Sequence, residues 1–369
     1  MLTTAEEVVP YLLAHNLLSA EAVVDGDLTV EDVSQRNRNF KVISSHGPSY
    51  LLKQGIGPDG ATTVAREAAI YGYLTDRENA GFSRYLPRFQ GYDPEERVLI
   101  LELVSEAEDL REYQARRGRF STGQAAALGD ALGRLHRLAG TGGGKEPQLE
   151  SFAHGPAWAL SMHRPTLAAF REISWANVEV IKIIQRFAEF GALLDELRQE
   201  WKAEALVHFD LRWDNCLVSR RPPARKTSLK IVDWEFAGPG DPCWDVGSIF
   251  SNYLSFWVIS MPITGDMQPE QFPEFARYPL VKMQPAIRSF WRSYVRRMEL
   301  DSRASDWLMR AVKYSAARLL ETAYTQMQSS VQVTSHALCL LQLSLNMLQR
   351  PHEASVHLLG IPLNDTSLA

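Results

Sequence analysis

Residues 208–215 read His-Phe-Asp-Leu-Arg-Trp-Asp-Asn, and residues 231–235, Ile-Val-Asp-Trp-Glu, follow after a basic, proline-containing turn. The first stretch has the pattern His-x-Asp-x-x-x-x-Asn, and in the second an aspartate follows a short apolar run. Hydrophobic alternation on both sides predicts short strands around a loop. An acid-rich turn with a capping aspartate would explain either feature alone, but not their spacing and order. We therefore expect the chemistry of the protein to lie here.

The residue types in this segment suit phosphoryl transfer. That reaction needs an acceptor hydroxyl held in line, a base beside it, and oxygen ligands that hold magnesium against the phosphates. Asp210, Asn215 and Asp233 supply these groups. Magnesium prefers hard oxygen donors and keeps several waters, so one carboxylate, one amide oxygen and the nucleotide phosphates suffice. We therefore do not expect a dense cluster of metal ligands.

This combination of motifs resembles the catalytic and metal-binding loops of the aminoglycoside phosphotransferase family, which includes choline kinases and shares its core fold with protein kinases. The resemblance covers most of the chain. It implies an ATP- and magnesium-dependent kinase that moves the γ-phosphate to a hydroxyl acceptor. It also implies that Asp210 accepts the hydroxyl proton, that Asn215 and Asp233 bind magnesium, and that His208 braces the loop.

The remainder of the chain fits the two lobes of that fold. Short β-type runs between residues 28 and 103 predict a strand-rich region, and helical spacing dominates after Ser121. We expect an α+β, bilobal, protein kinase-like fold, in which residues 1–104 form a small antiparallel sheet lobe that binds nucleotide. Residues 105–369 would form a larger, mainly helical lobe for catalysis and acceptor binding, with a helical insertion around residues 150–200.

A nucleotide site is predicted upstream of the catalytic segment. Lys53 lies in a strand-like run, as the family's phosphate-positioning lysine does, and Glu67 on the following helix would be its partner. Each residue alone would be interpreted as an ordinary surface group, but their order before the catalytic segment favours nucleotide binding. Residues 101–104 resemble the hinge that pairs with adenine, so the backbone at Glu102 and Val104 is the predicted contact.

Residues 33–40, Val-Ser-Gln-Arg-Asn-Arg-Asn-Phe, stand where kinases have a glycine-rich loop over the phosphates, yet they contain no glycine. Two interpretations of Arg36 and Arg38 follow. They replace the missing backbone donors with charge-assisted contacts to phosphate, or they are solvated turn residues. The sequence leaves both open.

Two further residues receive roles from the resemblance. Residues 238–245 are similar to the family's Gly-Asp-Pro-x-x-Asp segment, in which the last aspartate anchors the catalytic loop, so Asp245 is expected to be structural. Arg212 stands where a basic residue contacts the transferred phosphate in protein kinases. It is a candidate phosphate clamp, and an ion pair with Asp214 or Glu235 is the alternative.

Composition narrows the class of protein. The formal net charge is −5 and the pI is near 6.0, which gives no global attraction to nucleic acid. Three cysteines without Cys-x-x-Cys spacing suit free thiols in a reducing compartment. Residues 1–19 predict an amphipathic helix rather than a signal peptide, and the apolar window 246–263 predicts a buried helix rather than a membrane span. We expect a cytoplasmic protein without a membrane partner.

The acceptor is the open question. Four arginines, Arg288, Arg292, Arg296 and Arg297, fall on one predicted helix, which disfavours a strongly cationic acceptor. A small-molecule alcohol is the first expectation. Ser or Thr hydroxyls of a peptide are the second, as proposed for relatives associated with lanthipeptide and thioamitide biosynthesis, where a protein partner in a biosynthetic complex is left open. A nucleotide-binding scaffold without catalysis is the third.

Overall fold

The computed structural model describes residues 4–34, 36–76, 80–138, 155–167, 173–219, 228–263 and 268–362. The chain forms two compact units. Residues 1–112 and 214–237 belong to the first, and residues 113–213 and 238–369 belong to the second. The functional division between residues 104 and 105 stays a prediction. The basic turn that precedes Ser228 lies outside the described residues.

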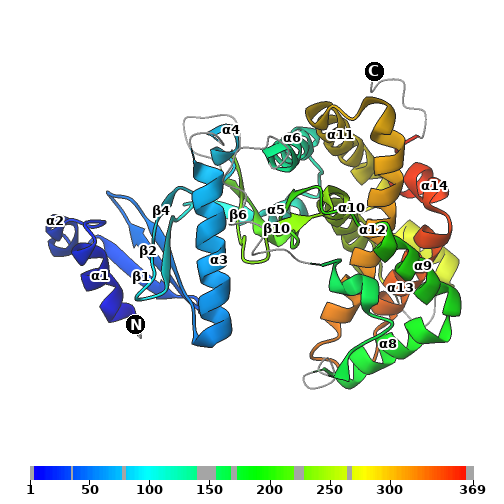
Figure 1. Cartoon of the computed structure of the whole chain (residues 1–369), viewed down its shortest axis with the longest axis horizontal. Coiled ribbons are helices and arrows are strands. Elements are labelled where there is room, and N and C mark those ends of the chain that lie inside the picture. The colour runs from blue at the N-terminus through cyan, green and yellow to red at the C-terminus, as the bar shows by residue number, and fades with distance from the viewer. Residues whose placement is uncertain are drawn as a thin grey trace. The chain divides into compact units, whose positions relative to one another are not determined.

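A five-stranded antiparallel sheet with the order β1-β2-β3-β5-β4 forms the centre of the first unit. Figure 1 shows α1 and α3 on opposite faces of this sheet. The strands are β1 (Leu28–Asp32), β2 (Arg38–Ser44), β3 (Tyr50–Gln54), β4 (Phe89–Asp93) and β5 (Val98–Glu102), and the helices are α1 (Ala5–Ala14), α2 (Ala20–Val24), α3 (Gly57–Thr75) and α4 (Ala80–Ser83).

The two faces of the sheet follow from the alternation of its side chains. Phe40 and Leu52 point to one face, where they are fully buried together with Val8 and Leu12 of α1. The predicted N-terminal amphipathic helix is therefore confirmed. Lys53 is one residue beyond Leu52, so it points to the opposite face, which α3 covers.

A second, three-stranded sheet joins segments that are far apart in the sequence. β6 (Ala107–Asp109) pairs with β8 (Cys216–Ser219), and β8 pairs with β9 (Ser228–Ile231), both in antiparallel fashion. This pairing attaches residues 214–237 to the strand-rich unit, although the segments before and after them belong to the helical unit.

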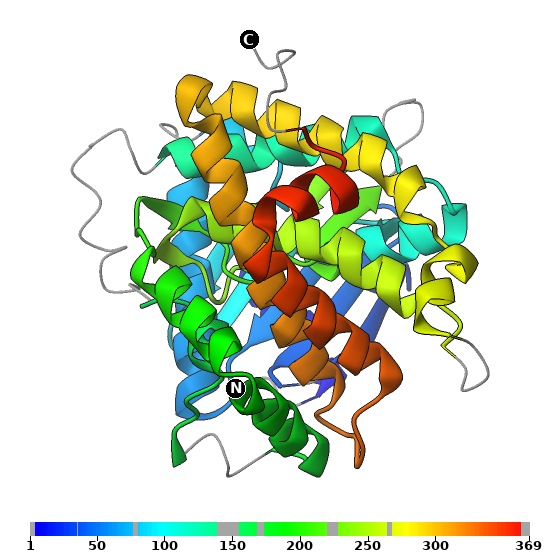
Figure 2. The ribbon, with the colours of Figure 1, turned by 90° about the vertical axis from the view of Figure 1, so that its right-hand side faces the viewer.

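Helices make up most of the second unit, and α10 (Pro242–Ile259) is its most buried helix. α10 accounts for most of the apolar window that the sequence predicts as a buried helix. Its close packing needs Gly247, because a Cβ there would lie 2.8 Å from the carbonyl oxygen of Ala311 on α12. Figure 2 shows α6 and α11 side by side. The other elements of this unit are α6 (Thr122–Leu138), η3 (Trp158–Ser161), α8 (Trp175–Arg186), α9 (Ala188–Gln199), β7 (Ala205–Val207), β10 (Gly238–Gly240), η6 (Pro269–Phe275), α11 (Leu280–Met298), η7 (Asp301–Arg303), α12 (Ala304–Gln326), α13 (Ser335–Gln349), α14 (Pro351–Glu353) and η8 (Ala354–Leu358).

Two short helices, α5 (Leu110–Arg117) and η5 (Trp213–Asn215), carry the chain between the units. Among the helices described, none combines the length and the apolar character that a membrane span requires. The small antiparallel sheet and the mainly helical second unit agree with the predicted α+β class.

Candidate active site

Lys53, Glu67 and Asp233 form an ion-pair triad within the first unit. The Nζ atom of Lys53 lies 3.0 Å from each carboxylate oxygen of Glu67 and 2.7 Å from Oδ1 of Asp233. The side chain of Glu67 is only 1% exposed, so its charge depends on the ammonium group for compensation. The structure thus contains the pair that the sequence predicts, with Asp233 as a third member.

The triad keeps Lys53 charged. Burial on its own lowers the pKa of an ammonium group, but the carboxylates of Glu67 and Asp233 outweigh burial and raise the pKa of Lys53. The backbone N–H of Trp234 also donates to Glu67, at 3.3 Å, which ties the Asp-Trp-Glu segment to α3. A protonated lysine held between two carboxylates is suited to exchange one of them for a phosphate.

Strand register brings Asn215 and Asp233 to the same end of a β-hairpin. Cys216 pairs with Ile231, so Asn215 immediately precedes the first strand and Asp233 closely follows the second. The N–H of Val232 donates to the carbonyl oxygen of Asn215 at 3.0 Å. Antiparallel pairing therefore closes the long sequence gap between the two predicted metal ligands.

The glycine-free segment between β1 and β2 is closed by its own side chains. The N–H of Ser34 donates to Asp32 at 2.9 Å, and the N–H of Asn39 donates to the Ser34 hydroxyl at 3.0 Å. The N–H of Val33 donates to the carbonyl oxygen of Asn39 at 2.8 Å. Short polar side chains thus hold this segment closed without a glycine.

The two arginines of this segment differ in position. The Arg36 side chain is 60% exposed, and its guanidinium lies 3.7 Å from Glu235, two residues beyond Asp233. Arg38 has the same side-chain parity on β2 as Phe40, so it points to the α1 face of the sheet, opposite to Lys53. The geometry therefore favours Arg36 over Arg38 as a phosphate contact.

The predicted hinge, residues 101–104, begins in the last two residues of β5. The N–H of Glu102 donates to the carbonyl oxygen of Arg88, and the N–H of Leu103 donates to that of Ser49, both at 2.8 Å. The next N–H, that of Val104, has no hydrogen-bond partner within the described parts of the chain. An extended backbone with such a donor suits adenine, and the role of Glu102 and Val104 stays a prediction.

In the second unit, α10 holds the catalytic segment. The fully buried carboxylate of Asp245 accepts hydrogen bonds from the N–H groups of His208, at 2.7 Å, and Phe209, at 3.1 Å. Asp245 thus has the anchoring contacts that the resemblance implies. Asn252 accepts a hydrogen bond from the N–H of Trp213 at 3.1 Å. Asn252 was not predicted from the sequence, although its position two turns beyond Asp245 on the same helix face was a usable signal.

Phe209 has a strained backbone, with φ of 65°. This left-handed conformation costs a non-glycine residue roughly 1–2 kcal/mol. Here the aromatic ring stacks on Trp201 at 5.9 Å, and the indole N–H of Trp244 donates to the Phe209 carbonyl oxygen at 2.9 Å. Asp233 has a similar φ of 68°. Backbone strain of this kind concentrates at functional sites.

Asp210 has a guanidinium group at each carboxylate oxygen. Nη2 of Arg318 on α12 lies 3.3 Å from Oδ1, and Nη2 of Arg212 lies 3.1 Å from Oδ2. The Arg318 side chain is only 7% exposed, whereas that of Arg212 is 44% exposed. One oxygen of Asp210 is therefore held by a buried group, and the other is held by a group that solvent reaches.

The partners of Arg212 differ from the alternatives that the sequence suggests. Asp214 forms a two-point ion pair with Arg111, at 2.6 and 3.4 Å. Glu235 pairs with Arg36, as described above. Arg212 itself pairs with Asp210. The two residues are only two positions apart, and the turn of the loop directs both side chains to the same side.

Arg318 is a functional candidate that our sequence analysis did not single out. Besides Asp210 it binds Glu321, with 2.6 Å between Nη1 and Oε2, and it lies over the ring of Trp244 at 5.4 Å. Burial on its own lowers the pKa of a guanidinium, but Glu321 and Asp210 outweigh burial and raise the pKa of Arg318. The indole N–H of Trp158 donates to the other oxygen of Glu321, at 3.3 Å. An arginine at i and a glutamate at i+3 were the available signal.

Comparison with known proteins now identifies the family. The model of the phosphotransferase enzyme family matches residues 30–279, which include the Lys53 triad and residues 208–215. The chain belongs to this family. It is an ATP-dependent kinase with a hydroxyl group as acceptor. No curated protein matches its sequence.

The solved structures similar to this kinase share its fold. Choline kinase from Cryptosporidium parvum Iowa II has a TM-score of 0.59 and 13% identity, covering 96% of this chain and 98% of that one. An amicoumacin kinase in complex with AMP-PNP, Ca²⁺ and Ami has a TM-score of 0.52 and 14% identity, covering 92% and 96% respectively. The predicted bilobal, kinase-like fold is therefore confirmed.

The hairpin end of this kinase fits a divalent cation. Asn215 contributes an amide oxygen and Asp233 a carboxylate, which are the hard donors that magnesium prefers. Within the described residues, no group of three or more His, Cys, Asp and Glu side chains is arranged to hold a metal. A cation at the hairpin would therefore take its remaining ligands from water and nucleotide phosphates.

Proposed function

We propose that this kinase transfers the γ-phosphate of ATP, held with Mg²⁺, to the hydroxyl group of a small-molecule alcohol. The observation that supports this most strongly is the triad of Lys53, Glu67 and Asp233. A charged lysine paired with a helix glutamate and with the aspartate of a metal-binding hairpin is the arrangement that phosphoryl transfer uses to hold a triphosphate.

Each half of the site has a distinct task. In the first unit, Lys53 binds phosphate oxygens, Glu67 holds Lys53, and Asn215 and Asp233 are the metal ligands. Bound Mg²⁺ supplies charge neutralisation at the phosphates. The hinge backbone at Glu102 and Val104 binds adenine.

In the second unit, Asp210 orients the acceptor hydroxyl and accepts its proton, and His208 braces the loop. Arg318 fixes one oxygen of Asp210, so the other oxygen faces the acceptor once Arg212 turns toward the transferred phosphate. Arg212 is suited to that change because it is half-exposed, whereas Arg318 is buried and held by Glu321.

The charges beside Asp210 bear on the choice of acceptor. The carboxylates of Asp210 and Glu321 are balanced by the guanidinium groups of Arg212 and Arg318, so this cluster has no net negative charge to attract a polycation such as an aminoglycoside. Trp158, which is 49% exposed and hydrogen-bonded to Glu321, adds a flat apolar surface connected to the same network. A neutral or anionic alcohol with an apolar face matches these features. The alternatives of a peptide acceptor and of a scaffold stay predictions.

Incubation with γ-labelled ATP and a panel of acceptors tests this function. The panel contains neutral, anionic and cationic alcohols and Ser- or Thr-containing peptides, and products are detected by mass. We expect a mass gain of one phosphate on an uncharged or anionic small alcohol. Transfer to peptides alone, or to polycations alone, would contradict the proposed acceptor class.

Metal dependence is expected in nucleotide binding. ATP should raise the thermal midpoint by several degrees in magnesium buffer and much less in EDTA, because Asn215 and Asp233 reach the phosphates only through a metal. Ligand at a hundred times its dissociation constant stabilises a folded protein by about 2.7 kcal/mol. Differential scanning fluorimetry measures this, and equal stabilisation in both buffers would instead point to a metal-independent scaffold.

Arg36 and Arg38 should differ in their effect on ATP. Arg36→Ala removes a charge-assisted contact to phosphate, which contributes about 1.5–3 kcal/mol, so ATP should bind roughly ten- to a hundredfold more weakly. Arg38→Ala is the matched control and should leave ATP affinity almost unchanged, because its side chain points to the α1 face. Adenosine should respond to neither change. Calorimetric titration measures both affinities, and equal effects of the two substitutions on ATP would contradict the preference for Arg36 as the phosphate contact.

A further inference from the structure

A hollow of about 280 Å³ lies on the second unit, and none of the residues of the candidate active site lines it. It is formed by the end of α5, the segment that follows α5, and the start of α11. No acidic residue lines it. Its walls are formed by Ala115, Arg116, Arg117, Gly118, Phe120, Arg277, Tyr278, Pro279 and Lys282.

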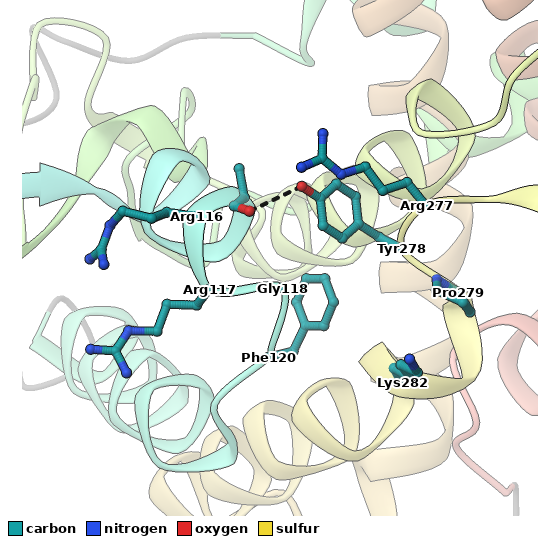
Figure 3. Close-up of a pocket in the computed structure, with 9 residues that line it drawn as sticks. Arg116, Arg117, Gly118, Phe120, Arg277, Tyr278, Pro279 and Lys282 are labelled. Carbon is teal, nitrogen blue, oxygen red and sulfur yellow. Dashed lines mark hydrogen bonds between the residues drawn. The ribbon is translucent and has the colours of Figure 1, made fainter.

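Three of the lining cations lack a carboxylate partner within the described residues: Arg117, Arg277 and Lys282. The guanidinium of Arg117 lies over the ring of Tyr113 at 5.1 Å, and that of Arg277 lies over Tyr278 at 5.2 Å. All three side chains are exposed. Figure 3 shows Arg116 and Arg117 on one side of the hollow, with their guanidinium ends turned away from Tyr278 and Phe120, and Arg277 and Lys282 on the other side. Positive side chains that lie close together without acidic neighbours repel one another, and a bound anion would relieve this repulsion.

The aromatic wall between these cations is rigid. The hydroxyl of Tyr278 donates to the carbonyl oxygen of Ala115 at 3.0 Å, the hydrogen bond drawn in Figure 3. The Tyr278 ring also stacks on Phe256 at 4.7 Å and meets Phe120 edge-on at 6.4 Å. The hollow is therefore shaped before any ligand arrives, which reduces the ordering cost of binding.

The start of α11 adds to the positive potential. This 19-residue helix begins at Leu280, has no side-chain cap, and carries no acidic residue in its first turn. The partial positive charge at a helix N-terminus attracts anions when no acidic side chain in the first turn compensates it. Glu112 and Glu274 are the nearest acids in sequence, and neither lines the hollow.

We propose that this basic pocket binds a compact small-molecule polyanion of the phosphate ester or diphosphate class. The guanidinium fork of Arg277 and the ammonium group of Lys282 match phosphate oxygens, and a ligand with two negative charges compensates both cations. The volume suits a ligand smaller than the drug-sized molecules that fill pockets of about 300–1,000 Å³. The pocket shares no residue with the nucleotide site and does not depend on the proposed acceptor.

Titration calorimetry with inorganic pyrophosphate tests the pocket. The full chain is titrated in EDTA at constant ionic strength, so that metal-dependent binding at the nucleotide site is suppressed. We expect Arg277→Ala with Lys282→Ala to weaken pyrophosphate roughly tenfold or more, because charge-assisted contacts are lost. Both side chains are exposed, so the double variant should keep the thermal midpoint of the wild type.

A control variant tests whether the pocket itself holds the anion. Arg186→Ala with Lys202→Ala removes the same charge from exposed positions elsewhere on this unit and should leave the affinity unchanged. Equal weakening by both double variants would reduce the effect to net charge, and full retention of pyrophosphate affinity in Arg277→Ala with Lys282→Ala would assign the anion to another site. Either outcome, or absence of binding to the wild type, overturns the proposal, as would tighter binding of citrate than of pyrophosphate.

Discussion

Asp210→Asn should lower phosphoryl transfer by about two to four orders of magnitude while leaving ATP affinity and the thermal midpoint near those of the wild type. A positioned general base contributes roughly 10²–10⁴-fold to rate, and asparagine keeps the size of the side chain but cannot accept the hydroxyl proton. The measurement is turnover of the acceptor identified in the panel, together with calorimetric titration of ATP. Transfer at near wild-type rate would remove Asp210 from the role of base.

Asp214→Asn is the matched control for that experiment. It makes the same chemical change four residues further along the loop, at a carboxylate that pairs with Arg111. Both of these side chains are more than a third exposed, so the ion pair contributes about 0–1 kcal/mol. Turnover should therefore stay within a few-fold of the wild type. A loss as large as that of Asp210→Asn would show that the loop responds to any change of charge.

Lys53→Met should destabilise the folded protein by about 3–5 kcal/mol and abolish measurable ATP binding. Removing one partner of a buried ion pair leaves the other charge uncompensated, and Glu67, at 1% exposed, has no route to solvent. Asp233 would lose its partner as well. Urea unfolding followed by tryptophan fluorescence measures the loss, because Trp234 hydrogen-bonds to Glu67 and reports on this region.

Lys41→Met and a paired variant complete that experiment. Lys41 has the same parity on β2 as Asn39, which pairs with Lys53, so it shares a face of the sheet with Lys53. Its replacement should cost less than about 1 kcal/mol. Lys53→Met combined with Glu67→Met should recover part of the stability, since the uncompensated buried charge is gone, but it should not recover ATP binding. If Lys53→Met alone kept the free energy of unfolding of the wild type, the triad would not be needed for the stability of the fold.

The sequence by itself determined the class of fold and the chemistry. The spacing of His208, Asp210 and Asn215, followed by Asp233, requires a loop between strands, and the hydrophobic periods on either side separate strand-rich from helical regions. These are local features, and local features are what a single sequence records. Strands with weak alternation, such as β4 with its intermediate burial throughout, give a weaker local signal.

Only the tertiary structure decided which residues act together. Arg36 precedes β2 and lies beside Glu235, whereas Arg38 is on β2 and points to the α1 face, a distinction that depends on position in the fold and not on residue type. Arg318 reaches Asp210 from a helix more than a hundred residues away in sequence, and Asn252 and Asp245 hold the same loop from α10. The basic pocket likewise combines α5 with the start of α11. Long-range contacts of this kind leave no periodic pattern in the chain, because each depends on where two distant segments pack, and packing is a property of the whole fold.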